Sequence, residues 1–195
     1  AFTLAGVLVN FVLSAMGTDY YPRLTAIADD NQKVNQEVNA QTEIALLLAV
    51  PALAATVAFM PFIMRLFYSS RFDAAIPILR LAVFGILGRI ISWPMSIIIV
   101  AKRKGGLFFF IELITGIFNI LILIICYKLI GLPGTGLAFA LLYLWYIGIL
   151  LIITKKLLAF KWDVFNIKLI LASLIGISLL SIIQIIHIYI FIKAI

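Results

Sequence analysis

The chain has 195 residues, of which 65% are hydrophobic and only 12% charged, and it carries a formal net charge of +7. Its mean hydropathy of +1.23 lies far outside the range of soluble globular domains and excludes that class. The basic residues stand at the ends of apolar runs rather than along a groove interleaved with aromatic residues, so we expect no nucleic-acid partner. Composition therefore predicts an all-α, polytopic transmembrane helix bundle surrounded by membrane lipids.

Apolar runs suited to a hydrocarbon core of roughly 30 Å predict about six membrane-spanning helices. In chain order they cover residues 2–17, 44–64, 74–101, 107–127, 129–154 and 169–192. Because the first run opens on Ala1 without a methionine or a basic stretch, it argues against a signal peptide and predicts a slice of a larger bundle. The polar segment 17–43 is expected to be a loop with a short amphipathic surface helix, since Val34 and Val38 follow helical spacing.

The distribution of Lys and Arg predicts an orientation in the membrane. Nine of the 15 basic residues fall in the loops after the first, third and fifth runs, five lie toward the opposite side, and Arg89 lies within the third run. Short cytoplasmic loops carry the excess of basic residues. The odd-numbered loops are therefore predicted to be cytoplasmic.

Arg89 near the middle of the third run is the most informative residue of the chain. A fixed charge at the bilayer centre costs about 2.5 kcal/mol or more, and such residues face a bundle interior or a wet cavity. Gly85, Ser92 and Ser96 share its helical face. Close helix packing would explain the small residues but not the arginine. Pro94 interrupts the backbone hydrogen bonds of the same run and is a candidate hinge.

The fourth run repeats this pattern, with Glu112, Thr115 and Asn119 on one helical face. Glu112 either neutralises Arg89 or leaves it free for an anionic substrate, and a guanidinium suits phosphate because its planar fork donates two hydrogen bonds. The candidate substrate-binding residues are Arg89, Glu112, Asn119, Ser92 and Ser96.

Residue patterns for enzyme chemistry are missing from the sequence. It has no glycine-rich phosphate loop opening a helix, no paired Cys or His ligands, and no Ser, His and Asp set that could converge. We therefore expect no catalytic residue, no metal and no cofactor, with a membrane-embedded lipid transferase as the enzymatic alternative. The single histidine, His187, is expected to anchor the last helix at the interface rather than to relay protons.

Three segments, in this order and spacing, resemble the polysaccharide (O-antigen-type) flippases of the multidrug/oligosaccharidyl-lipid/polysaccharide exporter superfamily. They are Gly17–Leu24, with Tyr21 and Pro22, then Leu66–Ala75, with Phe72, and Gly131–Ala138. The resemblance implies a transporter of two lobes related by a pseudo-two-fold axis. Residues 1–154 would form part of its C-terminal lobe, and residues 155–195 a cytoplasmic loop with an additional transmembrane helix.

The resemblance also implies a function and partners. Such proteins flip undecaprenyl-diphosphate-linked oligosaccharide across the inner (cytoplasmic) membrane by alternating access, beside a polysaccharide polymerase and other assembly proteins. Arg89 would then bind the diphosphate. Two alternatives stay open at this point. In a drug/cation antiporter of the same superfamily a cavity acid would bind the coupling ion, and in a structural membrane subunit Glu112 would simply satisfy Arg89.

Overall fold

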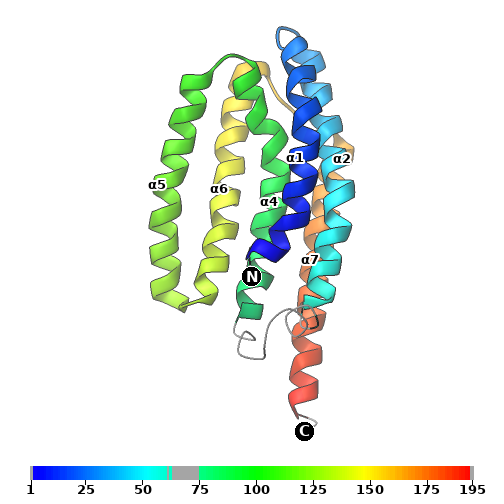
Figure 1. Ribbon diagram of the computed structural model, residues 1–195, viewed down its shortest axis with the longest axis vertical. Helices are drawn as coiled ribbons and strands as arrows, with labels where there is room; N and C mark the ends of the chain where they lie inside the picture. Colours follow the sequence, from blue (N-terminus) through cyan, green and yellow to red (C-terminus); the bar gives the residue numbers. More distant parts are fainter. Residues whose placement is uncertain (1, 61, 63–74, 194–195) are drawn as a thin grey trace.

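The computed structural model describes residues 2–60, 62 and 75–193, and the side chains of residues 1–8 and 187–195 are not described. Six helices make up this part of the chain (Figure 1): α1 (Phe2–Ala26), α2 (Asn31–Ala58), α4 (Ile76–Ala101), α5 (Gly105–Ile130), α6 (Pro133–Leu158) and α7 (Val164–Lys193). No strand occurs among the described residues, so the predicted all-α bundle is confirmed. Phe72 and the side chain of His187 lie outside the described residues.

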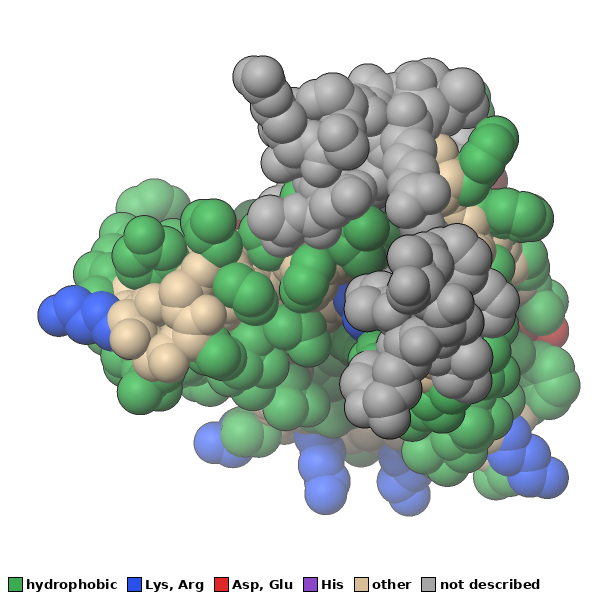
Figure 2. Space-filling model, turned by 90° about the horizontal axis from the view of Figure 1, so that it is seen from below, with side chains coloured by type: hydrophobic (Ala, Val, Ile, Leu, Met, Phe, Trp, Pro, Cys, Tyr) green, Lys and Arg blue, Asp and Glu red, His purple; other side chains and the backbone are tan. Residues whose placement is uncertain are grey.

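Five of these helices are long and apolar enough to cross a membrane. They are α2, α4, α5, α6 and the Val164–Ile186 part of α7. Exposed side chains along their outer faces are large and apolar, as a lipid environment requires. Figure 2 shows hydrophobic side chains over much of the molecule seen from below, with most of the visible lysine and arginine side chains at its periphery. The chain therefore has the structure of a multi-pass membrane protein.

The central helix of the bundle is α4 (Figure 1), which packs against α6 on one side and against α1 and α2 on the other. Its fully buried side chains include Leu87 and Ile90. The two outer helices pack mainly on one neighbour each, α5 on α6 and α7 on α2, with smaller contacts to α4. All helix connections after α1, α4 and α6 lie at the same end of the bundle, as the order of the predicted spans requires.

The expected loop over residues 17–43 is wrong, because α1 continues to Ala26 and α2 begins at Asn31. Val34 and Val38, expected on a short surface helix, are buried in the same α2 that carries the second apolar run. The N terminus of α2 is fixed by Asp30, whose carboxylate accepts hydrogen bonds from two backbone N–H groups of the first turn at 3.1 Å. The polar residues of this segment therefore lie in two packed helices and not in a long loop.

The short linker between α6 and α7 is held against α2 by two asparagines. Asn39 Oδ1 accepts hydrogen bonds from the Asp163 backbone N–H at 2.8 Å and from Asn166 Nδ2 at 3.0 Å. Asn39 Nδ2 donates to the Lys161 carbonyl at 3.0 Å, and Asn35 Oδ1 accepts from the Lys161 backbone N–H at 2.9 Å. Asn39 is only 2% exposed, so these bonds replace the water that its amide would otherwise bind. They fix where α7 starts relative to α2.

Candidate functional site

A polar cavity of about 160 Å³ lies between α4, α5 and α6. It brings together four of the five residues that the sequence singles out, Arg89, Ser92 and Ser96 on α4 and Glu112 on α5. The remaining lining residues are Trp93, Thr115, Leu142, Tyr143 and Tyr146. The fifth candidate, Asn119, is exposed on α5 and does not line this cavity.

Arg89 is half-buried at the middle of α4. Among the described residues, no carboxylate lies within 4 Å of it and no hydrogen bond is made by its side chain. Direct pairing with Glu112 is therefore not formed. Glu112 Oε1 instead accepts a hydrogen bond of 2.5 Å from the Tyr146 hydroxyl. The cavity thus holds a cation and a carboxylate that face the same space without neutralising each other at contact distance.

The serine hydroxyls of the cavity are turned toward their own helix. Ser92 Oγ donates to the Arg89 carbonyl at 3.1 Å, and Ser96 Oγ donates to the Trp93 carbonyl at 2.8 Å. With its proton used within α4, each oxygen keeps lone pairs for a hydroxyl or N–H group in the cavity. The two serines can therefore accept hydrogen bonds from a bound molecule.

A second cavity, of about 520 Å³, lies on the α1 side of α4 and shares Arg89 and Trp93 with the first. Its α1 wall consists of Asn10, Leu13, Ser14, Gly17 and Tyr21. Arg89 is thus accessible from both sides of the central helix. Tyr21, part of the first family-like segment, is one of these lining residues.

Sequence reasoning missed Trp93 and the α1 wall. Trp93 follows Arg89 by four residues and therefore shares its face, a signal that was present in the sequence. On α1, Asn10, Ser14 and Tyr21 fall at i, i+4 and i+11 and so share a helical face, but without a charged residue nothing marked that face as lining a cavity.

The candidate hinge Pro94 is buried within a continuous α4 and is braced by α1. The Tyr20 hydroxyl donates a hydrogen bond of 3.0 Å to the Pro94 carbonyl, and the Tyr20 ring lies 5.6 Å from that of Trp93. Pro22, two residues further along α1, likewise lies inside its helix. The helix α1 therefore contacts α4 beside the cavity, at the position where α4 lacks a backbone N–H donor.

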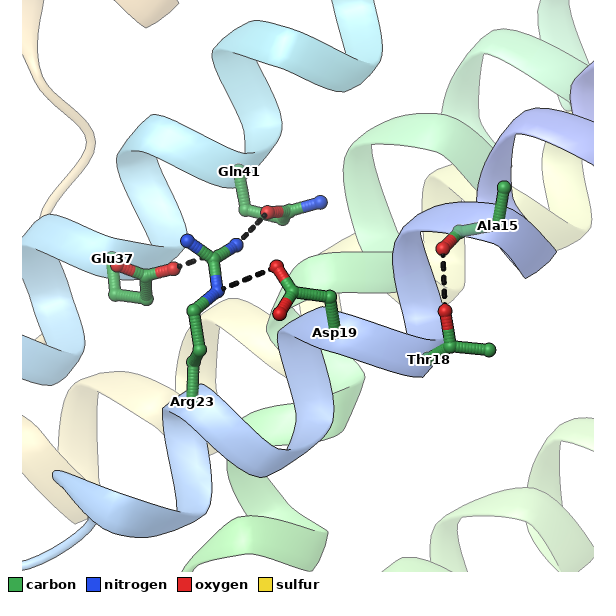
Figure 3. Close-up of polar contacts among 6 residues, drawn as sticks. All are labelled: Ala15, Thr18, Asp19, Arg23, Glu37 and Gln41. Atoms are coloured by element: carbon green, nitrogen blue, oxygen red, sulfur yellow. Dashed lines mark hydrogen bonds and ion pairs between the residues drawn. The ribbon is translucent and has the colours of Figure 1, made fainter.

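At the end of the bundle, Arg23 joins α1 to α2 (Figure 3). Its guanidinium lies 3.0 Å from Asp19 and 3.2 Å from Glu37, and it donates to the Gln41 side chain at 3.2 Å. Arg23 and Asp19 are largely exposed, so this cluster adds little to stability. Arg23 differs from Arg89 in pairing with two carboxylates.

Comparisons with protein-family models, with curated proteins and with solved structures found no match. The role of the two cavities therefore has to be argued from the residues that line them. Those residues supply a cation, a carboxylate, hydroxyl groups and aromatic faces halfway along an apolar bundle.

Proposed function

We propose that this chain belongs to a membrane transporter that flips a lipid-linked oligosaccharide, of the undecaprenyl-diphosphate type, across the cytoplasmic membrane. The observation that carries the proposal is Arg89, a half-buried cation at mid-helix without a carboxylate partner within 4 Å among the described residues. Keeping a charge at this depth is costly unless something compensates it. An anionic substrate group provides that compensation, and a diphosphate matches the guanidinium fork.

The other lining groups fit the sugar part of such a substrate. Aromatic rings offer flat apolar faces for the C–H side of a sugar ring, and Trp93, Tyr143 and Tyr146 supply three of them. The Glu112 carboxylate and the serine oxygens accept hydrogen bonds from sugar hydroxyls. Because Arg89 borders both cavities, a phosphate bound to it can stay bound while access changes from one cavity to the other.

The resemblance of Gly17–Leu24 and Gly131–Ala138 to polysaccharide flippases supports the same proposal. In this proposal the odd-numbered loops are cytoplasmic, Pro94 serves as a hinge of alternating access, and a polysaccharide polymerase and other assembly proteins are the partners. The protein moves its substrate without changing a covalent bond, so it is not an enzyme.

One observation favours a second candidate, a drug/cation antiporter. Glu112 is bound by Tyr146 and does not pair with Arg89, so its carboxylate is open to a coupling cation in the same cavity. The two candidates differ in which residue is indispensable. The flippase depends on Arg89 and the antiporter on Glu112.

The test is complementation in cells that lack their own polysaccharide flippase, using the complete protein with equal membrane abundance of each variant. We expect Arg89→Ala to abolish surface polysaccharide and Arg89→Lys to retain part of it, because an ammonium keeps the charge but not the fork. Arg80→Ala is the matched control, since Arg80 lies on α4 but lines neither cavity. Full activity of Arg89→Ala would exclude the flippase mechanism. Cation-driven drug export that disappears in Glu112→Gln would establish the antiporter instead.

A further inference from the structure

A third cavity, a groove of about 440 Å³ between α4, α6 and α7, is lined almost entirely by apolar side chains. Leu87 and Ile91 form its floor on α4, while Leu144 on α6 and Leu171 on α7 stand on its two sides. In the part of the chain that the structure describes, α6 and α7 do not pack extensively against each other, so the groove between them stays open. It shares no lining residue with the two polar cavities.

The groove opens toward the hydrocarbon of the membrane. Leu144 is 68% exposed, Leu171 52% and Ile167 45%. With so few polar atoms in its walls, the groove offers a ligand little hydrogen bonding and suits an apolar chain. A narrow apolar groove open to lipid suits an extended hydrocarbon chain.

Positive charge gathers at one end of this groove. The segment 155–168 carries Lys155, Lys156, Lys161 and Lys168, all exposed, against the single acid Asp163. Lys155 follows Leu144 by 11 residues, which places it on the same face of α6 about 16 Å further along the helix. Lys168 lies one residue beyond the groove residue Ile167 on α7, rotated about 100° from it, so it flanks the groove without lining it. The side chains that border this end of the groove therefore complement a negative charge.

Trp162 also lines the groove and is held in place by the linker. Its neighbours Lys161 and Asp163 are hydrogen-bonded to Asn35 and Asn39 of α2. The Trp162 ring packs edge-on against Phe160, with ring centroids 4.9 Å apart. A fixed indole between an apolar groove and a cluster of lysines is typical of the level where lipid chains meet headgroups.

We propose that this groove is a binding site for an anionic phospholipid, with one acyl chain lying between α6 and α7 and the phosphate headgroup bound by Lys155 and Lys168. The apolar walls select the chain, and the lysines select an anionic headgroup over a zwitterionic one. The site is independent of the proposed transport function, because none of its residues lines the polar cavities.

The test uses Trp162 as a built-in probe. A Trp93→Phe/Trp145→Phe variant of the full chain leaves Trp162 as the only tryptophan, and it is reconstituted in phosphatidylcholine vesicles that contain a small fraction of brominated lipid. Bromine on an acyl chain quenches indole fluorescence only at close range. We expect brominated phosphatidylglycerol to quench Trp162 several-fold more strongly than the same fraction of brominated phosphatidylcholine.

Two further variants separate headgroup from chain recognition. Lys155→Gln and Lys168→Gln should each lower the preference for phosphatidylglycerol about fivefold, the equivalent of about 1 kcal/mol for one basic residue near a membrane surface. Lys128→Gln, at the opposite end of the bundle, is the matched control and should leave the preference intact. Ala140→Phe should fill the groove and reduce quenching by both lipids, whereas Ile120→Phe on the exposed face of α5 should not.

Three results would overturn the proposal. Equal quenching by the two brominated lipids would show that the headgroup is not recognised. A preference that survives the combined Lys155→Gln/Lys168→Gln change would place the anionic lipid elsewhere. Absence of quenching by either lipid would show that another protein segment, and not lipid, covers the groove.

Discussion

Replacement of Gly136 by alanine tests how closely α4 and α6 must approach. A Cβ atom at this position would overlap the Ile78 carbonyl oxygen and come within 3.1 Å of both the Ile78 carbonyl carbon and Leu81 Cβ. Because the obstacle includes backbone, the helices themselves have to separate. Overpacking of this kind costs up to about 3 kcal/mol, while the better helix propensity of alanine returns about 1 kcal/mol. The expected net loss is about 2 kcal/mol.

Gly148→Ala on the same helix is the matched control, since a Cβ atom there meets nothing within 4 Å. It should gain about 1 kcal/mol from helix propensity alone. For a chain of this size, 1 kcal/mol shifts the unfolding midpoint by roughly 2–4 °C. Gly136→Ala should therefore lower the midpoint by about 4–8 °C, and Gly148→Ala should raise it by about 2–4 °C.

The single cysteine of the chain provides the assay. Cys126 is 4% exposed, so a thiol-reactive dye labels it only when the bundle opens. The midpoint of labelling on heating, in detergent, compares the two variants with the unmodified protein. If Gly136→Ala were as stable as Gly148→Ala, the close contact between α4 and α6 would not exist as described.

Three further predictions concern polar groups that join helices or cap them. Asn39→Ala should cost about 1–3 kcal/mol, because its buried partners lose their hydrogen bonds, and trypsin should then cleave faster after Lys161 in the freed linker. Tyr20→Phe should lower the unfolding midpoint by about 2–4 °C, since one buried hydrogen bond contributes about 1 kcal/mol; an unchanged midpoint would argue against the bond. Hydrogen bonds from the Lys33 backbone and side chain lower the pKa of Asp30 below 3.8, so its stabilising effect is present above that pH and lost as the pH falls through the lowered pKa. In Asp30→Asn, the unfolding midpoint measured between pH 2 and 6 should no longer show this pH-dependent stabilisation.

The all-α class and the approximate positions of the helices could be predicted because a long apolar run in a membrane can form few structures other than a helix. The error over residues 17–43 arose because the ends of helices were inferred from the ends of apolar runs. Arg23 and Asn39 extend α1 and α2 beyond those runs, and their polar groups are satisfied by tertiary partners that no local pattern reveals. Helix boundaries in such segments depend on what the neighbouring helix offers.

Much of the candidate site followed from periodicity, because residues at i, i+3, i+4 and i+7 must share a helical face. Periodicity does not indicate how far along that face a cavity extends, which is why Thr115 lines the cavity but Asn119 does not. It also does not indicate which helix packs opposite. The contribution of Asn10 and Ser14 could be seen only after α1 was placed beside α4.

The attachment of α5 has a mechanical consequence for the cavity. This helix leans mainly on α6, through the stacked rings of Phe118 and Trp145, 4.5 Å apart, and the bond between Glu112 and Tyr146. It nevertheless supplies Glu112 and Thr115, which form one wall of the polar cavity. A small tilt of α5 about its contact with α6 would change the width of the cavity. It would also move the Glu112 carboxylate away from Arg89 without any movement of α4.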